Sequence, residues 1–397
     1  MIYLDTSATT PLLPKVRDAM LRLMDESISC KLGNASSLHS AGSRAKFALN
    51  EARTEIAKYI EVPPLELIFT SSGSESNNTI IHTFEHCPII VSAIEHPSVL
   101  YAAEAYGDPF IKIPVDERGI INLNFLKTKL EELTKDNPRQ KILVSIMLAN
   151  NETGTIEPVE EVSALIKIFK DKGYRNIFLH SDATQAVSKI PVNIKKLGVD
   201  YLTFTAHKLG GPVGISALYI RAGAPFKSLI IGGAQENKRR AGTSNVILAA
   251  GFAAAVSYCQ EKNVLDNYQK VRVLRNYLAQ RITKILPDAK IITPLEENLS
   301  LPNILNVAFP YAEGESTQLY LDLEDIEVST GSACASGDLE PSHVIMAMYH
   351  DAEIAHGSVR FYLPLDITKA KLDQLLTKLP SIVTKIQDLS TLNKAKS

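Results

Sequence analysis

The stretch Tyr201-Leu202-Thr203-Phe204-Thr205-Ala206-His207-Lys208-Leu209-Gly210-Gly211-Pro212 joins a short apolar run to a lysine and a glycine-rich turn. The run 201–205 is rich in β-branched and aromatic residues, which predicts a buried β-strand. A lysine directly after such a strand can lie at the floor of a crevice, where loss of hydration favours the neutral, nucleophilic amine. The competing interpretation of Lys208 is a solvated loop lysine, which the sequence Lys-Leu-Gly-Gly alone would favour.

Other apolar runs alternate with helical patterns between about residue 14 and residue 260. This alternation is typical of a mainly parallel sheet covered by helices on both faces. Most of the runs end in polar or glycine-containing segments, and in an open α/β sheet these strand ends form the ligand crevice. The expected strands are 67–70, 89–93, 142–148, 177–180, 201–205 and 217–220. After about Ser257 the pattern changes, which predicts a second, smaller α+β domain.

The charge balance and the cysteines exclude several classes of protein. Lys and Arg number 42 and Asp and Glu 44, so the formal net charge is -2 and nucleic acid is disfavoured as the primary ligand. The chain has neither a long apolar run nor a secretion signal, so we expect no membrane contact. Its four cysteines, Cys30, Cys87, Cys259 and Cys334, are widely spaced and predict reduced thiols in a cytoplasmic protein without a structural metal site.

Two further strand ends carry residues suited to a phosphorylated cofactor. Asp182 could hold a protonated pyridine nitrogen, the pairing that makes a pyridoxal ring an electron sink. Alternatively, Asp182 is a helix N-cap with Gln185 as its capping-box partner. The sequence Ser72-Gly73-Ser74-Glu75-Ser76 is expected to open a helix at about Ser76, where backbone N–H groups would form a phosphate cup, although such a motif is often only a capped helix. With Lys208, these features predict a pyridoxal phosphate site.

Three more residues could act at the same crevice. His96 follows a predicted strand and could stack on a cofactor ring and move protons, although a histidine before proline is more often a loop residue. Cys334 lies among small residues that cannot bury its thiol well, which makes it a candidate nucleophile, whereas the neighbours of Cys259 indicate a packed helix. Arg360 lies in a short predicted strand and could clamp an amino-acid carboxylate, the alternative being a surface salt bridge.

These motifs resemble those of the class I cysteine desulfurases, fold type I pyridoxal phosphate enzymes that include NifS and IscS. The resemblance extends over nearly the whole chain, and the ANNETG and RRAGT motifs are more similar to NifS than to IscS. The matching motifs are YLDTSATT at 3–10, GNASSLH at 33–39, ANNETGT at 149–155, DATQ at 182–185, HK at 207–208, RRAGT at 239–243, GSAC at 331–334, LEPSH at 339–343 and RF at 360–361.

The resemblance implies a role for each cofactor residue. Lys208 would form the internal aldimine with pyridoxal 5'-phosphate, and Asp182 would pair with the pyridine nitrogen. Gln185 would hydrogen-bond the ring oxygen, and His96 would stack on the ring. The phosphate would be held by Gly73, Ser74, Thr205 and His207, together with Thr243 from the partner subunit of a homodimer.

The resemblance also implies the reaction. Arg360 would hold the carboxylate of free L-cysteine, with Asn151 near both the ring and this carboxylate. Lys208 and His96 would carry the proton traffic. Cys334 would take the sulfur as a persulfide, leaving L-alanine, and pass it to an acceptor protein such as an iron–sulfur scaffold or a thiolation relay. Cys334 could also transiently share a cluster with a scaffold partner.

We therefore expect an α/β fold of the fold type I, aspartate aminotransferase-like kind. A large domain over 14–258, with a mainly parallel sheet of the seven-stranded type, would bind the cofactor. Residues 1–13 and 259–397 would form the smaller α+β domain. The alternatives are a selenocysteine lyase or an aminotransferase, and a catalytically inactive scaffold subunit that keeps the fold.

Two positions depart from the family pattern. Val213 stands where the family usually has a lysine before Gly214. After the Arg-Phe pair, where the family commonly has Ser-Leu followed by Gly or Ser and then Arg, this chain reads Tyr362-Leu363-Pro364-Leu365. Neither departure touches an assigned catalytic role, and we expect both to bear on the surroundings of the site or on the acceptor rather than on the reaction.

Overall fold

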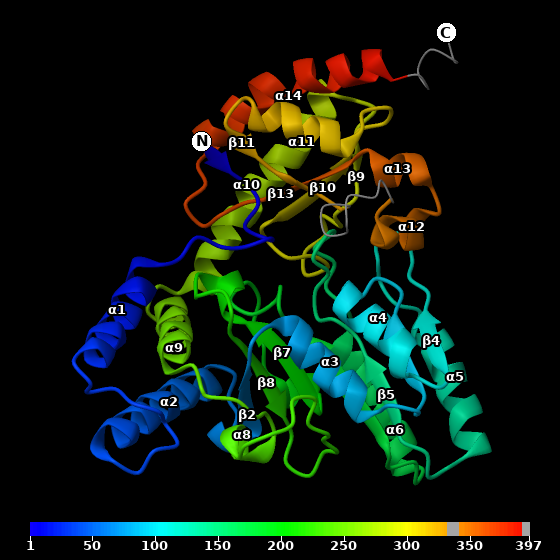
Figure 1. Ribbon diagram of the computed structural model, residues 1–397. Helices are drawn as coiled ribbons and strands as arrows, with labels where there is room; N and C mark the ends of the chain where they lie inside the picture. The colour runs from blue at the N-terminus through cyan, green and yellow to red at the C-terminus, as the bar shows by residue number, and fades with distance from the viewer. Residues whose placement is uncertain (332–340, 391–397) are drawn as a thin grey trace.

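Two β-sheets of different size organise the chain, the smaller lying above the larger in Figure 1. The structure is a computed structural model, and it describes residues 1–331 and 341–390. The large sheet has seven strands in the order β2-β8-β7-β6-β5-β3-β4. These strands are β2 Leu67–Thr70, β3 Ile89–Ser92, β4 Phe110–Ile113, β5 Ile142–Ser145, β6 Ile177–Asp182, β7 Tyr201–Thr205 and β8 Ser216–Ile220.

The strand pairing confirms the expected mainly parallel sheet. β8 alone runs antiparallel to its neighbours β2 and β7, and the other pairs are parallel. β4 was not among the expected strands. It lies at the edge of the sheet and is only partly buried, so it lacks the continuous apolar run by which the other strands were found.

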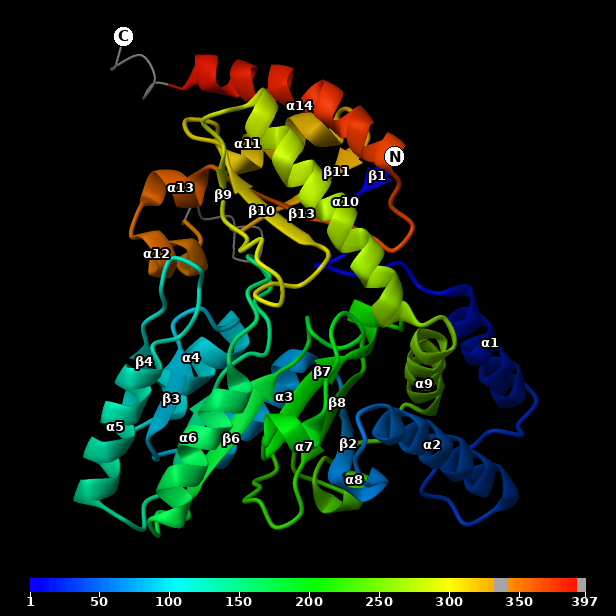
Figure 2. The ribbon, with the colours of Figure 1, turned by 180° about the vertical axis from the view of Figure 1, so that it is seen from behind.

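Helices cover both faces of this sheet, as Figures 1 and 2 show from opposite sides. Leu202 and Phe204 of β7 point into one core, to which α5, α6 and α7 contribute, and Tyr201 points into the other, to which α3 and α4 contribute. The helices of this part are α1 Pro14–Ile28, α2 Ser40–Tyr59, η1 Pro64–Glu66, α3 Gly73–Thr83, α4 Pro97–Tyr106, α5 Leu123–Asp136, α6 Val159–Asp171, α7 Ile194–Leu197, η2 Ala206–Leu209, α8 Gln235–Lys238 and α9 Val246–Glu261. A strand buried on both faces, such as β7, stabilises the fold by burial of apolar area from two sides.

The small sheet is antiparallel, in the order β12-β13-β10-β9, and is formed by the C-terminal part of the chain. Its strands are β9 Lys290–Ile291, β10 Ile304–Ala308, β12 Ser329–Thr330 and β13 Ser358–Tyr362. The accompanying helices are α10 Val264–Ile285, α11 Gly314–Asp322, α12 His343–Tyr349, α13 Ala352–His356 and α14 Lys369–Leu389. In the described residues no helix combines the length and the apolar character needed to cross a bilayer.

The N-terminal residues join this C-terminal part. β1 Ile2–Tyr3 pairs in parallel with β11 Ile326–Glu327, and the Tyr362 N–H donates to the Leu4 carbonyl at 2.8 Å. The expected domain boundary between residues 258 and 259 falls inside α9, which packs on α1 and α2. The division into two domains stays a prediction, and its boundary fits better after Glu261, where α9 ends.

The loop after β5 connects the two parts. Thr155 forms a β-bridge with Ser300, and the Leu301 N–H donates to the Gly154 carbonyl at 2.8 Å. At the end of this loop Glu157 is buried: its Oε2 accepts from the Ile121 N–H at 3.1 Å, and its Oε1 has no partner among the described residues. Burial raises the pKa of Glu157 to about 8, from an ordinary value of 4.5.

This raised pKa makes the stability depend on pH. Between about pH 4.5 and 8 the folded protein holds a proton on Glu157 that the unfolded chain has released. The free energy of unfolding therefore falls as the pH rises through this window. Glu157→Gln keeps an acceptor for Ile121 and cannot ionise, so we expect the variant to gain on the wild type by about 2–4 kcal/mol between pH 5 and pH 9, measured by urea unfolding. Glu160→Gln, on the exposed surface of α6, is the control. If the difference in free energy of unfolding between Glu157→Gln and the wild type were the same at pH 5 and pH 9, this expectation would be contradicted.

Candidate active site

A cavity of about 430 Å³ lies at the carboxyl ends of the parallel strands. Most of the residues expected at the site line it: Gly73, Ser74, His96, Asn151, Asp182, Gln185, Thr205, His207, Lys208 and Arg360. These residues come from both sheets. Arg360 lies on β13 of the small sheet, and the others lie at or after the ends of strands of the large sheet, namely β2, β3, β5, β6 and β7. Two expected residues are not placed there. Thr243 lines a separate cavity of about 210 Å³, and Cys334 lies outside the described residues.

Lys208 lies on η2, directly after β7, as the sequence predicts. Its Nζ donates to the backbone carbonyls of Ser7 and Ala8, at 2.8 Å for Ala8. The amine therefore lies against the N-terminal residues at the cavity wall in a partly buried position, which favours the crevice interpretation of Lys208. The sequence motif 3–10 was noticed, but its contact with Lys208 could not be inferred from either segment alone.

The carboxylate of Asp182 is fixed by two donors at the end of β6. Its Oδ2 accepts from Asn77 Nδ2 at 2.7 Å, and its Oδ1 accepts from the Thr184 N–H at 2.9 Å. The residues after Asp182 form turns and not an α-helix, so the alternative that Asp182 is a helix N-cap is wrong. Sequence analysis missed Asn77, although it lies one helical turn after Gly73 and therefore faces the same side of α3.

The phosphate cup begins earlier than expected, because α3 starts at Gly73 and not at about Ser76. Ser72 is the N-cap, and its Oγ accepts from the Glu75 N–H at 3.1 Å. The N–H groups of Gly73 and Ser74 belong to the first turn and have no partner within the helix. A side chain at position 73 would fill the cup, since its Cβ would lie 3.0 Å from Thr205 Cγ2.

The cavity wall carries buried polar atoms that fit a phosphorylated pyridine. Thr205 Oγ1, Thr184 Oγ1 and Gln185 Oε1 are buried and have no hydrogen-bond partner among the described residues. Buried polar groups are nearly always paired, so such atoms on a cavity wall are suited to a polar ligand. Together with the helix start and the Asp182 carboxylate, they match the phosphate, the ring oxygen and the ring nitrogen of pyridoxal 5'-phosphate.

The histidines of the site are neutral near pH 7. Burial lowers the pKa of His96, with further lowering by Lys208 and His343 against the opposite effect of Asp182. Its Nδ1 accepts from the Ser98 N–H at 3.1 Å, so the neutral ring carries its proton on Nε2. Burial, with Lys208 and Lys189, lowers the pKa of His207 to about 4.

Arg360 is buried in the middle of β13, so it does not form a surface salt bridge. Its Nη1 donates to the Asn151 carbonyl at 3.2 Å and its Nη2 to Ser329 Oγ at 2.8 Å. The Nε has no partner among the described residues. A buried guanidinium that keeps free hydrogen-bonding capacity at a cavity wall is suited to a carboxylate ligand.

The two departures from the family pattern lie in different places. Val213 is 69% exposed and is a surface residue. Tyr362 is buried beside Arg360, and its hydroxyl donates to the Asn151 carbonyl at 2.7 Å. Burial raises the pKa of Tyr362, so this hydroxyl stays protonated and remains a donor. Tyr362 of the second departure therefore contacts a residue of the cavity wall, whereas Leu365 is 38% exposed.

The other cysteines agree with the sequence analysis where the structure describes them. Cys259 is buried on α9, which confirms the expected packed helix, while Cys30 is exposed and Cys87 is partly buried. All three are free thiols.

Comparison with known proteins shows the family. The model of the class-V aminotransferases matches residues 2–375. The cysteine desulfurase IscS of Dictyoglomus turgidum is 42% identical over 401 residues, covering 98% of this chain and 96% of its own. A solved NifS-like protein is 36% identical with a TM-score of 0.85, over 97% of this chain and 99% of that one. A solved structure described as SspA in complex with cysteine is 26% identical with a TM-score of 0.74, over 92% and 99% of the two chains.

These matches extend over nearly the full length of this chain and of each relative. The α/β fold with its seven-stranded, mainly parallel sheet agrees with the fold of the NifS-like relative. The chain belongs to the class-V aminotransferase family, with the IscS and NifS-like cysteine desulfurases among its relatives.

Proposed function

We propose that the chain is a pyridoxal phosphate-dependent cysteine desulfurase that converts L-cysteine to L-alanine and transfers the sulfur through Cys334. The observation that carries this proposal is the arrangement of Lys208, Asp182 and Arg360 on one cavity. These side chains offer an amine, a carboxylate and a guanidinium for a cofactor aldehyde, a pyridine nitrogen and an amino-acid carboxylate. The relatives named cysteine desulfurase support the same reaction. An aminotransferase or a selenocysteine lyase is not favoured by them.

The residues of the chain would hold the cofactor from three sides. Lys208 Nζ would bind it covalently, after leaving the carbonyls of Ser7 and Ala8. Asp182, fixed by Asn77, would keep the pyridine nitrogen protonated. When bound, the cofactor supplies an electron sink for charge that develops at the substrate Cα. The phosphate would lie against Gly73, Ser74, Thr205 and His207, and the side-chain amide N–H of Gln185 would donate to the ring oxygen.

The substrate would be oriented by Arg360. Its Nη groups now contact Asn151 and Ser329, and a carboxylate could accept from the same fork. His96, with its proton on Nε2, and the amine of Lys208 would exchange protons with the substrate. The solved relative described as SspA in complex with cysteine supports cysteine as the ligand of such a site.

Cys334 would receive the sulfur. Its thiolate attacks the substrate sulfur, and an S–S bond forms while the C–S bond breaks. The electron pair of the broken bond stays on the substrate carbon, which takes a proton, so the products are alanine and a persulfide on Cys334. No external oxidant is needed. The persulfide would then pass to an acceptor protein such as an iron–sulfur scaffold or a thiolation relay, and during this contact Cys334 could share a cluster with the scaffold.

We further propose a cytoplasmic homodimer. Thr243 lies outside the cavity of its own chain, which fits a role in the phosphate site of a partner subunit. The proposed domains are a cofactor domain that ends with α9 and a smaller domain that the N-terminal residues complete. The separate cysteines fit a reducing compartment.

Replacement of Lys208 tests the cofactor assignment. We expect Lys208→Ala to lose the visible absorption band of the lysine-bound cofactor and to lower sulfide release from L-cysteine by at least about 10³-fold, because Lys208 is the one lysine among the described residues that line the cavity. The absorption spectrum and a sulfide assay measure both effects. Lys46→Ala, on the exposed face of α2, is the control and should behave as wild type. A wild-type chain that is colourless and releases no sulfide would contradict the proposed function.

Replacement of Cys334 separates desulfuration from other chemistry on the same cofactor. We expect Cys334→Ser to keep the absorption band but to form no protein persulfide from L-cysteine, with sulfide release reduced by about 10²-fold or more. Mass spectrometry of the protein after incubation with cysteine detects the added sulfur. Cys30→Ser is the control, since Cys30 is a free and exposed thiol to which no role is assigned. An aminotransferase would be indifferent to the Cys334 change, so unaltered activity would exclude the proposed route.

A further inference from the structure

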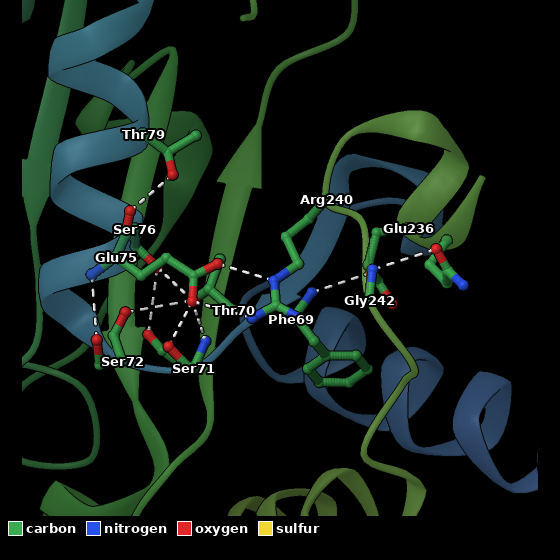
Figure 3. A network of polar contacts seen from close by, with 12 residues as sticks. Phe69, Thr70, Ser71, Ser72, Glu75, Ser76, Thr79, Glu236, Arg240 and Gly242 are labelled. Atoms are coloured by element: carbon green, nitrogen blue, oxygen red, sulfur yellow. Dashed lines mark hydrogen bonds and ion pairs between the residues drawn. The ribbon is translucent and has the colours of Figure 1, made fainter. Parts of the chain in front are cut away.

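A polar network lies behind the first turn of α3, on the side of Arg240 (Figure 3). The Glu75 carboxylate accepts from Arg240 Nε at 2.9 Å and from Arg240 Nη2 at 3.2 Å. It also accepts from the Ser71 N–H at 2.8 Å and from the Ser71 hydroxyl. The Glu75 side chain is 8% exposed and that of Arg240 24% exposed, so the ion pair is largely shielded from water.

The position of Glu75 poses an electrostatic problem for the phosphate cup. Gly73 and Ser74 line the cavity, and Glu75 is the next residue of the same helical turn. Burial would raise the pKa of Glu75, but hydrogen bonds from Arg240 and Ser71 lower it, so the carboxylate is ionised at neutral pH. An anion in this turn competes with a phosphate for the positive end of the helix and repels it directly.

We propose that Arg240 is a positioning residue for the cofactor phosphate. Its guanidinium neutralises the Glu75 carboxylate and holds it on the far side of the first turn of α3. The N–H groups of Gly73 and Ser74 can then bind a phosphate without an uncompensated negative charge beside them. This inference rests on the proposed function, because it presumes that the cup binds the phosphate of pyridoxal 5'-phosphate.

The segment before Arg240 is hydrogen-bonded to β2, the strand that precedes the phosphate cup. Glu236 accepts from Arg53 at 2.6 and 2.8 Å and from the Phe69 N–H of β2 at 3.0 Å. The side chains of Glu236 and Arg53 are 4% and 10% exposed. Figure 3 shows Glu236 and Phe69 on the Arg240 side of the network. β2 thus positions both the start of α3, which follows it in the chain, and the segment that carries Arg240.

The backbone of this segment supports a fixed position for Arg240. Glu236, Asn237 and Lys238 are consecutive and have φ values of +48°, +56° and +65°. Left-handed backbone is unfavourable for residues with a side chain and persists only where the surroundings impose it. The buried Arg53–Glu236 pair supplies that constraint. Arg240 therefore reaches Glu75 from a preset backbone and not from a freely moving loop.

Charge compensation and a purely structural role predict different effects of the two single substitutions on phosphate binding. If the ion pair only stabilised the fold, loss of either partner would weaken the protein and its ligand binding alike. With charge compensation, loss of Arg240 leaves a carboxylate beside the phosphate, whereas loss of the Glu75 charge leaves a cation there. The two single changes should therefore act in opposite directions on phosphate binding, and the double change should cancel them.

The experiment is a double-mutant cycle on cofactor binding. Apoproteins of the wild type, Arg240→Gln, Glu75→Gln and the double variant are titrated with pyridoxal 5'-phosphate, and separately with pyridoxal, which lacks the phosphate. We expect Arg240→Gln to raise the Kd for pyridoxal 5'-phosphate about tenfold or more and to leave that for pyridoxal within about threefold. Glu75→Gln should bind pyridoxal 5'-phosphate at least as tightly as wild type, and the double variant within about threefold of wild type.

Arg44→Gln is the matched control, because Arg44 forms a comparable two-bonded pair with Glu26, at 2.7 Å for both bonds, between α1 and α2. It should change neither Kd. The inference is overturned if Glu75→Gln weakens pyridoxal 5'-phosphate as Arg240→Gln does, if pyridoxal is weakened equally, or if the double variant is no better than Arg240→Gln. Should Arg240→Gln not fold, Arg240→Lys and Glu75→Gln decide: the lysine keeps the charge and must hold the Kd within about threefold.

The two proposals fail in different ways. A wild-type chain that binds no pyridoxal 5'-phosphate contradicts the proposed function and this inference with it. A wild type that binds the cofactor but shows no opposition between the two single variants contradicts this inference alone.

Discussion

The packing of the N-terminal residues between the two sheets brings the parts of the site together, because the carbonyls of Ser7 and Ala8 accept from Lys208, about 200 positions later in the sequence. Lys208 is placed by β7 in the centre of the large sheet, and the two carbonyls belong to the N-terminal residues. Those residues pair in turn with β11 and with Tyr362 of the small sheet. One amine thus marks the point where three parts of the chain meet, and the cavity lies at that point.

Burial controls the charges around this amine. Behind it, Lys189 is 2% exposed and donates to the Lys208 carbonyl at 3.3 Å. Burial lowers the pKa of Lys189 to about 7, with a further contribution from Lys208, and burial likewise keeps His96 and His207 neutral. The basic groups near Lys208 are therefore partly or fully neutral near pH 7, while Asp182 accepts a hydrogen bond from Asn77.

What the sequence revealed depended on how local each signal was. The central strands could be predicted because both of their faces are buried, so their sequences are continuous apolar runs. The edge strand β4 is only partly buried and lacks such a run, so it was not predicted. The start of α3 was placed too late, since Gly73 and Ser74 have low helix propensity yet are favourable in a first turn that Ser72 caps.

Contacts between distant segments could not be predicted from either side alone. The strand around Arg360 was expected, but its burial was not, because the partners Asn151 and Ser329 come from other parts of the chain. The same holds for the hydrogen bond from Asn77 to Asp182.

Tyr362 shows how a contact between distant segments changes the interpretation of a residue. As a sequence departure it pointed to the surroundings of the site or to an acceptor surface, and its hydrogen bond to Asn151 places it next to the cavity wall. Its hydroxyl and the Arg360 guanidinium both donate to the Asn151 carbonyl, so the tyrosine helps to fix the loop against which the arginine is oriented. Burial therefore separates the two departures, since Tyr362 contacts a residue of the cavity wall and Val213 lies on the exposed surface.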